Sequence, residues 1–129
     1  MTSAKSGSSK KPRHNPSHRP EYSPAFLLEQ YMKVMISQPM KGKSTEQVRA
    51  ERTSVMAMLE AKGHTVVDTV FTEEPPAADN TALWNLGQSL CAMSHVDAVY
   101  FMEGWRQARG CLIEHMAAEK YGLWIIHQD

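Results

Sequence analysis

The stretch DAVYFMEGWRQARGCLIEHMAAEKYGLWII, residues 97–126, decides the fold of this chain. Its first six residues and its last four are apolar runs rich in β-formers, and they predict two buried strands. Between these runs, residues 103–111 mix glycine with polar and charged side chains and predict a loop. A helix should follow, with Gly122 as its C-terminal stop and an apolar face of Ile113, Met116, Ala117 and Tyr121. The stretch therefore predicts one βαβ unit with parallel strands.

The preceding residues repeat the alternation of strand and helix. Residues 32–37 and residues 64–71 are apolar runs that predict two more strands. Between them, Ser44 and Gln47 fit a capping box at the start of a helix that should continue to Lys62 and stop at Gly63. The apolar face predicted for this helix is Val48, Val55, Met58 and Leu59.

A third helix is predicted over residues 81–94, with Asn80 as its N-cap. One stripe of this helix is Leu83, Leu86, Leu90 and Met93, and Trp84 and Cys91 lie on an adjacent stripe. A helix with so wide an apolar surface either packs on both the sheet and a second subunit, or faces the functional site. We therefore expect a homodimer or a larger homo-oligomer.

This order of elements predicts an α/β fold, an open parallel sheet of about four strands with helices on both faces, in a flavodoxin- or Rossmann-like three-layer arrangement. Right-handed crossovers favour the strand order 2-1-3-4, in which the winding reverses between the first and third strands. Ligands of such sheets bind at this switch point, beyond the carboxyl ends of the strands. The loops expected there are residues 38–43 and 103–110.

The composition divides the chain into two parts. Residues 1–24 carry a net charge of +4 and almost no apolar side chains, which predicts a disordered basic tail, and residues 25–129 form the expected domain. That domain carries a net charge of −4 and lacks the basic footprint of a nucleic-acid-binding surface. No apolar run is long enough to span a membrane, and two unpatterned cysteines favour a reducing cytoplasm over a disulfide scaffold.

Glu114 is the candidate reactive group. We expect it in or near the first turn of its helix, where unpaired backbone N–H groups and the helix dipole favour the ionised carboxylate. That setting suits a nucleophile or an electrostatic stabiliser. Acidic residues also occur in first turns simply because they stabilise helices, so the position alone leaves both interpretations open.

Several motifs together resemble the nucleoside 2-deoxyribosyltransferase-like superfamily, and most closely a branch of small, often phage- or prophage-associated proteins. The motifs are residues 104–114, Ala117-Ala118, Tyr121-Gly122, and the strand 32–37 with the loop 38–42 that follows it. The resemblance covers roughly residues 32–126. It implies that Glu114 is the nucleophile that attacks C1′ of a deoxyribose, without a metal or organic cofactor. Three positions depart from the family pattern: Met35 stands where many members have Tyr, Ser89 where many have Asp, and Ala108 where Asp or Ser is usual.

Other predicted site residues flank Glu114 or lie in the two loops. Glu103 is either a general acid for the leaving base or a solvated loop charge. Arg106 and Arg109 either bind a phosphate or carboxylate, or pair with Glu103 or Glu114. Trp105 either stacks on a nucleobase or packs the loop. The full predicted substrate-binding set is Ser37, Gln38, Pro39, Met40, Gly42, Ser89, Gly104, Trp105, Arg106, Arg109 and Gly110.

The leading expectation is an enzyme that cleaves or exchanges the N-glycosidic bond of a deoxynucleoside or its monophosphate through a covalent glycosyl-enzyme on Glu114. The alternatives are a non-catalytic nucleotide-binding module that uses the same pocket, and an interaction protein in which Glu114 only stabilises its helix. The spacing of the histidines predicts no metal site, and no phosphate loop of Walker type is present.

Overall fold

The computed structural model describes residues 31–67 and 79–128. The predicted tail over residues 1–24 lies outside the described residues. So do residues 68–71 of the predicted second strand and most of the loop that follows it.

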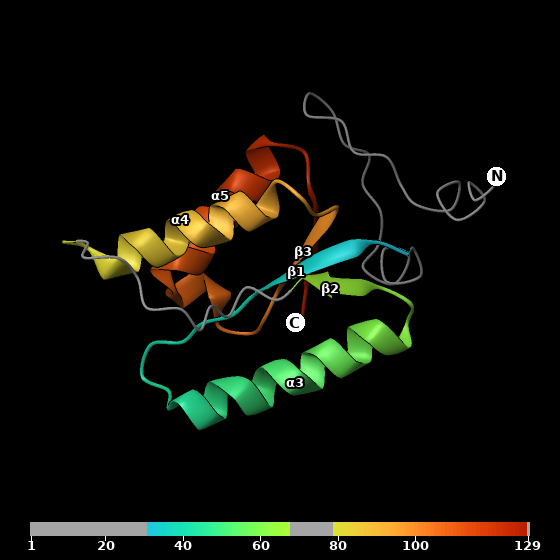
Figure 1. The fold of residues 1–129 in the computed structure, drawn as a ribbon, viewed down its shortest axis with the longest axis horizontal. Helices are drawn as coiled ribbons and strands as arrows, with labels where there is room; N and C mark the ends of the chain where they lie inside the picture. The colour runs from blue at the N-terminus through green and yellow to red at the C-terminus, as the bar shows by residue number, and fades with distance from the viewer. Residues whose placement is uncertain (1–30, 68–78, 129) are drawn as a thin grey trace.

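Four parallel strands form one open sheet in the order β2-β1-β3-β4, which confirms the predicted topology (Figure 1). The strands are β1 Lys33–Ser37, β2 Thr65–Val67, β3 Ala98–Phe101 and β4 Trp124–His127. In register, Ser37 at the end of β1 pairs with Phe101 at the end of β3, and Phe101 pairs with His127. The carboxyl ends of these three strands therefore meet at one edge of the sheet.

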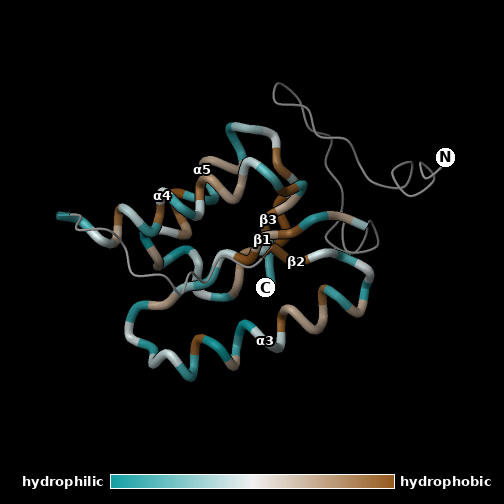
Figure 2. Tube along the Cα trace, in the orientation of Figure 1, coloured by the Kyte–Doolittle hydropathy of each residue, from teal (hydrophilic) through white to brown (hydrophobic). Residues whose placement is uncertain are grey.

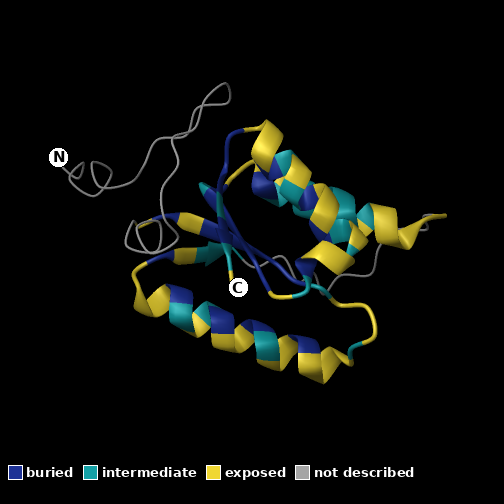
Figure 3. Ribbon diagram, turned by 180° about the vertical axis from the view of Figure 1, so that it is seen from behind, coloured by how far each residue is buried: buried dark blue, intermediate teal, exposed yellow. Residues whose placement is uncertain are grey.

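The sheet is covered on both faces, as the three-layer prediction requires. Val34 and Ile36 of β1 pack with Val55 and Leu59 of helix α3 (Thr45–Ala61), while Met35 packs into a second cluster on the other face. That second cluster includes Met93 of α4 (Thr81–Met93) and Cys111 and Ala118 of α5 (Arg109–Lys120). Successive side chains of a strand point to opposite faces, so β1 contributes to both cores. Figure 2 shows the apolar residues gathered along the strands, and Figure 3 shows the same strands buried between helices with exposed outer faces.

The predicted starts of α3 and α4 are confirmed by their caps. The Ser44 side chain accepts a hydrogen bond from the Gln47 N–H at 3.1 Å, and the Asn80 side chain accepts one from the Leu83 N–H at 3.0 Å. Each cap satisfies one of the backbone donors that a helix N-terminus leaves unpaired. At the other end of α3, Gly63 has φ +96°, a left-handed conformation that ends the helix at little steric cost.

The apolar face predicted for α5 was wrong for three of its four residues, and only Ala117 packs against the core. Ile113, Met116 and Tyr121 are 39%, 59% and 73% exposed, and the buried residues of this helix are Cys111, Glu114 and Ala118. The helix also begins earlier than expected, at Arg109, after a 3-10 turn (η1, Trp105–Gln107). Arg109 and Gly110 are therefore helical residues and do not belong to a loop.

Helix α4 lies beside α5 on the same face of the sheet (Figure 1). Of its predicted stripe only Met93 is buried, while Leu86 and Leu90 are half-buried and Leu83 is 60% exposed. None of its thirteen residues is charged. Among the described residues, no helix combines the length and apolar character needed to cross a membrane.

Candidate functional site

The candidate site is built on the last residue of β1 and the residue that follows it. Ser37 and Gln38 are both buried and continue the alternation of the strand. Ser37 reaches α5, where its hydroxyl donates a 2.6 Å hydrogen bond to Oε1 of Glu114. Gln38 reaches α3 on the other face, where its amide donates to the Val48 carbonyl at 2.8 Å. The two residues thus connect both helix layers at the carboxyl end of β1.

The two loops predicted to form the site do lie together. A Cβ atom added to Gly104, in the loop after β3, would lie 3.5 Å from Cγ of Pro39, in the loop after β1. Because β1 and β3 are neighbours and the winding reverses between them, these loops flank the switch point of the sheet. The structure therefore brings Ser37, Pro39, Gly104 and the α5 helix to one place.

Glu114 lies deeper in the protein than its predicted position implied. It is the sixth residue of α5, so it falls in the second turn, and its side chain is only 8% exposed. The expectation of a carboxylate in the first turn was wrong because the helix begins at Arg109. The field of the helix dipole falls off beyond the first turn, so it contributes little at this depth.

The charge state of Glu114 follows from its burial and its neighbours. Burial raises the pKa of its carboxyl group, and the hydrogen bonds of Ser37 and Ser89 and the charge of Arg52 lower it. Burial has the larger effect, so the pKa lies above its usual value. This direction is opposite to the one expected from the helix dipole. Ser89 of α4 therefore acts on the same carboxyl group as Ser37 of β1.

Cys111 lies one helical turn before Glu114 and belongs to the same buried cluster. Its side chain is 5% exposed, and burial raises the pKa of the thiol to about 11, while hydrogen bonding with Ser37 opposes that shift. At neutral pH the group is therefore a protonated thiol and a poor nucleophile. In this cluster the carboxyl group of Glu114 is the better nucleophile.

Arg52 is the charged side chain that the sequence analysis missed. It occupies the core-facing stripe of α3 with Val48, Val55 and Leu59, and it is only 4% exposed. One guanidinium nitrogen donates to Oε1 of Gln38 at 3.3 Å. The spacing of Arg52 between Val48 and Val55 was the available signal, because it places a cation on an apolar stripe.

Trp105 is held in an aromatic cluster. Its ring is 6% exposed and stacks on His115 of α5 at 4.1 Å and on His127 of β4 at 5.1 Å between ring centroids. The two imidazoles contact each other, with 3.1 Å between their Nε2 atoms, and Phe101 lies tilted against the indole. In this arrangement Trp105 packs the loop after β3, which is the second of the two roles considered for it.

The other predicted residues surround the site less closely. Glu103 is exposed, and its backbone N–H donates to the Gln128 side chain at 2.7 Å. Arg106 lies over the Trp105 ring at 4.6 Å, and Arg109 is exposed at the start of α5. Met40 and Gly42 are exposed in the loop after β1, and Gly110 is half-buried in α5.

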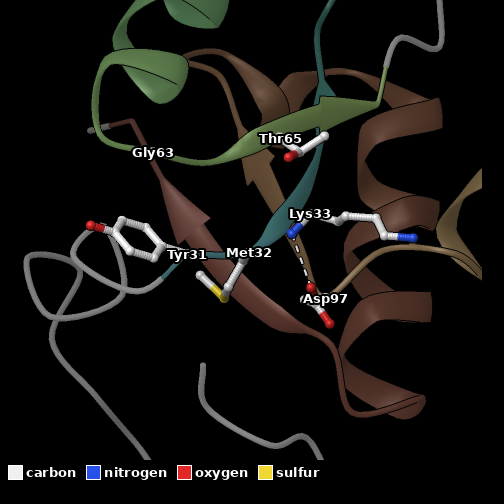
Figure 4. Close-up of a pocket in the computed structure, with 6 residues that line it drawn as sticks. All are labelled: Tyr31, Met32, Lys33, Gly63, Thr65 and Asp97. Carbon is white, nitrogen blue, oxygen red and sulfur yellow. Dashed lines mark hydrogen bonds between the residues drawn. The ribbon is translucent and has the colours of Figure 1, made fainter. Parts of the chain in front are cut away.

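An open hollow lies at the opposite edge of the sheet. Tyr31, Lys33, Thr65 and Asp97 line it together with Met32 and Gly63, and Asp97 accepts a 2.9 Å hydrogen bond from the Lys33 N–H (Figure 4). Asp97 thus fixes the start of β1 next to the start of β3. This edge holds the amino ends of the strands, where parallel sheets rarely bind ligands.

No group of three or more His, Cys, Asp or Glu side chains within residues 31–67 and 79–128 is arranged to hold a metal ion. What these residues do offer is one buried carboxyl group, that of Glu114, with the Ser37 hydroxyl as its hydrogen-bond donor at the carboxyl edge of the sheet.

Comparison with known proteins identifies the family of this chain. No curated protein and no protein of solved structure matches this sequence. The model of one family, described as a domain of unknown function (DUF4406), matches residues 32–127. This match spans the first strand to the last and includes both loops of the site, so the chain belongs to the DUF4406 family.

Proposed function

We propose that this protein cleaves or transfers the N-glycosidic bond of a deoxynucleoside or a deoxynucleoside monophosphate, with Glu114 as the nucleophile. The observation that carries the proposal is the buried Glu114 carboxyl group, oriented by the 2.6 Å bond from Ser37 at the switch point of the sheet. The resemblance to the nucleoside 2-deoxyribosyltransferase-like superfamily points to the same residue.

The proposed reaction has two displacement steps at C1′. A carboxylate oxygen of Glu114 bonds to C1′ while the C1′–N bond breaks, and the electron pair leaves with the base, which takes up a proton. In the second step, water or another base attacks C1′ and releases Glu114, and the attacking group loses its proton. Two displacements retain the configuration at C1′.

The surroundings of Glu114 suit this chemistry. Ser37 fixes one carboxylate oxygen, so the group is held in position before the substrate arrives. Only the ionised form is nucleophilic, and burial raises the pKa of Glu114. The rate should therefore fall as the pH drops through that raised pKa. Glu103, on the exposed side of the loop after β3, is the proposed proton donor to the leaving base.

The test is a panel of deoxynucleosides and their monophosphates, scored for free base by chromatography. Release of base from at least one of them by the wild-type protein, and from none by Glu114→Gln, is the expected result. A 2-fluoro-2-deoxy nucleoside should also leave a sugar on the peptide that contains Glu114, detectable by mass spectrometry, because the fluorine slows breakdown of the glycosyl-enzyme. An active Glu114→Gln variant without such an adduct would refute the assignment.

A second candidate is a nucleotide-binding module without catalysis. The pKa of Glu114 is raised, and a protonated carboxyl group can donate a hydrogen bond to a bound base. Saturable binding of a nucleotide by calorimetry, with no release of base, would select this function. In either case the proposed small-molecule partner is a nucleoside or nucleotide.

We also propose a second copy of the chain as a macromolecular partner. Helix α4 carries no charged residue and buries only Met93, so much of its apolar surface remains to be covered. The two cysteines, one exposed and one buried, are both free thiols, which is in keeping with a cytoplasmic location.

A further inference from the structure

Arg52 and Glu114 are the only Arg, Lys, Asp or Glu side chains that are buried among the described residues. They come from opposite layers, Arg52 from α3 and Glu114 from α5. A buried charge is costly unless a charge of opposite sign or several hydrogen bonds compensate for it. Both of these side chains form hydrogen bonds with residues at the end of β1.

The end of β1 links the two charges. Ser37 donates to the Glu114 carboxylate on one side of the sheet, and Gln38, the next residue, accepts from Arg52 on the other side. Gln38 is itself fixed, because its amide nitrogen donates to the Val48 carbonyl one helical turn before Arg52. Consecutive backbone positions thus place a buried cation and a buried carboxyl group at the same strand end.

We propose that Arg52 is a positioning residue for Glu114 and supplies its counter-charge from the opposite layer of the fold. The inference deepens the proposed function, on which its catalytic consequence rests. Gln38 holds the guanidinium in place, and Ser37 holds the carboxylate. The cation therefore acts on Glu114 from the α3 layer, on the other side of the sheet from α5.

The electrostatics of the site agree with this geometry. The charge of Arg52 lowers the pKa of Glu114 against the larger effect of burial. The other groups that act on this carboxyl are neutral hydroxyls, Ser37 from β1 and Ser89 from α4, while Cys111 on its own helix is a protonated thiol. Lys43 acts on Cys111, but it forms its own 2.9 Å ion pair with Glu51. Loss of Arg52 should therefore raise the pKa of Glu114 further.

The test is a pH titration of the Glu114 carboxyl group by NMR in protein labelled with ¹³C-glutamate, assigned with Glu114→Gln. In Arg52→Met the midpoint should rise by on the order of one pH unit, because an opposite charge has been removed. Arg52→Lys should keep the midpoint near that of the wild type. Arg49→Met, an exposed arginine in the same helix, is the matched control and should not change it. An unchanged midpoint in a folded Arg52→Met protein would overturn the proposal.

A second measurement needs no change at Arg52. The Nε–Hε signal of Arg52 should follow pH with the same midpoint as the Glu114 carboxyl group in the wild type, and should lose that dependence in Glu114→Gln. If the Arg52 signal does not change as Glu114 ionises, the proposal is overturned, even if Arg52→Met fails to fold.

Activity separates this inference from the proposed function. If a nucleoside substrate is found, the acid limb of its pH–rate profile should move upward in Arg52→Met by the same amount as the carboxyl titration. If no substrate releases its base, the proposed function fails, and the NMR titrations still decide the role of Arg52.

Discussion

The proposed role of Glu114 and its position in the fold favour different protonation states. A nucleophile needs the ionised carboxylate, whereas burial favours the neutral acid. An acid whose pKa in the folded protein exceeds its unfolded value stabilises the fold below the unfolded pKa, and this contribution is lost as the pH rises through the folded pKa. Burial raises the pKa of Glu114, so at neutral pH its ionised form weakens the fold.

Glu114→Gln should therefore abolish base release without loss of stability at pH 7. The amide keeps the shape of the side chain and can still accept the Ser37 hydrogen bond, but it carries no charge and is a poor nucleophile. Thermal unfolding should give a melting temperature equal to or above that of the wild type. Glu60→Gln, an exposed change on α3, is the control. A clear loss of stability in Glu114→Gln alone would show that the carboxylate has a mainly structural role.

Ser37→Ala removes the donor that lies 2.6 Å from Glu114. Because this hydrogen bond lowers the pKa of the carboxyl group, its loss should move the acid limb of the pH–rate profile to higher pH. It should also cost about 1–3 kcal/mol of unfolding free energy, since a buried polar group loses its partner. Ser54→Ala, at an exposed position of α3, should change neither quantity. A lower kcat with an unshifted acid limb would contradict this account of Ser37.

At the scale of single residues, the sequence identifies the carboxyl group and the strand end that holds it, but not the charge of opposite sign. Glu114 and Ser37 both lie in motifs that mark the carboxyl edge of a parallel sheet. Arg52 is separated from Glu114 by more than sixty residues and lies in the other layer. Only the packing of both helices on β1 shows that the two charges share one strand end.

At the scale of elements, the turn between α3 and β2 depends on Gly63. Its φ is +96°, and a Cβ atom added there would lie 2.4 Å from the ring of Tyr31. Gly63→Ala should therefore lower the unfolding free energy by about 1–3 kcal/mol. Gly87→Ala, inside α4 with open space around it, should instead raise it by roughly 0.5–1 kcal/mol. Chemical denaturation measures the unfolding free energy of both variants. If the two substitutions change it in the same direction, the backbone conformation of the glycine does not decide the sign of the change.

The order of elements and their caps could be predicted because each rests on local signals, such as Ser44 and Asn80 before helical runs and Gly63 after one. The buried face of α5 could not be predicted from such local signals. Helical spacing joins Ile113, Met116 and Ala117, but the sheet is contacted by Cys111, Glu114 and Ala118, which are smaller or polar. Periodicity finds a helix, and it does not decide which of two possible stripes faces inward when the outward one is also apolar.

At the scale of the whole molecule, α4 and α5 leave an apolar surface uncovered. Leu83 on α4 and Leu112 and Met116 on α5 are 60%, 45% and 59% exposed, on two helices that pack against each other. A two-fold interface places the same surface of each copy against the other. Charged side chains near the two-fold axis therefore face charges of the same sign. The absence of any charge from α4 suits such an interface.

We therefore expect light scattering at micromolar concentration to give a mass of at least twice the 14.5 kDa of one chain. Met116→Glu places a carboxylate on the proposed interface and should yield a folded monomer, because each copy would have to desolvate that charge. Tyr121→Glu is the control: Tyr121 is the residue directly after α5 and is 73% exposed. It should leave the mass unchanged.

Two outcomes would show that this surface faces solvent. One is a wild-type protein with the mass of one chain, and the other is a Met116→Glu variant with the mass of the wild-type oligomer.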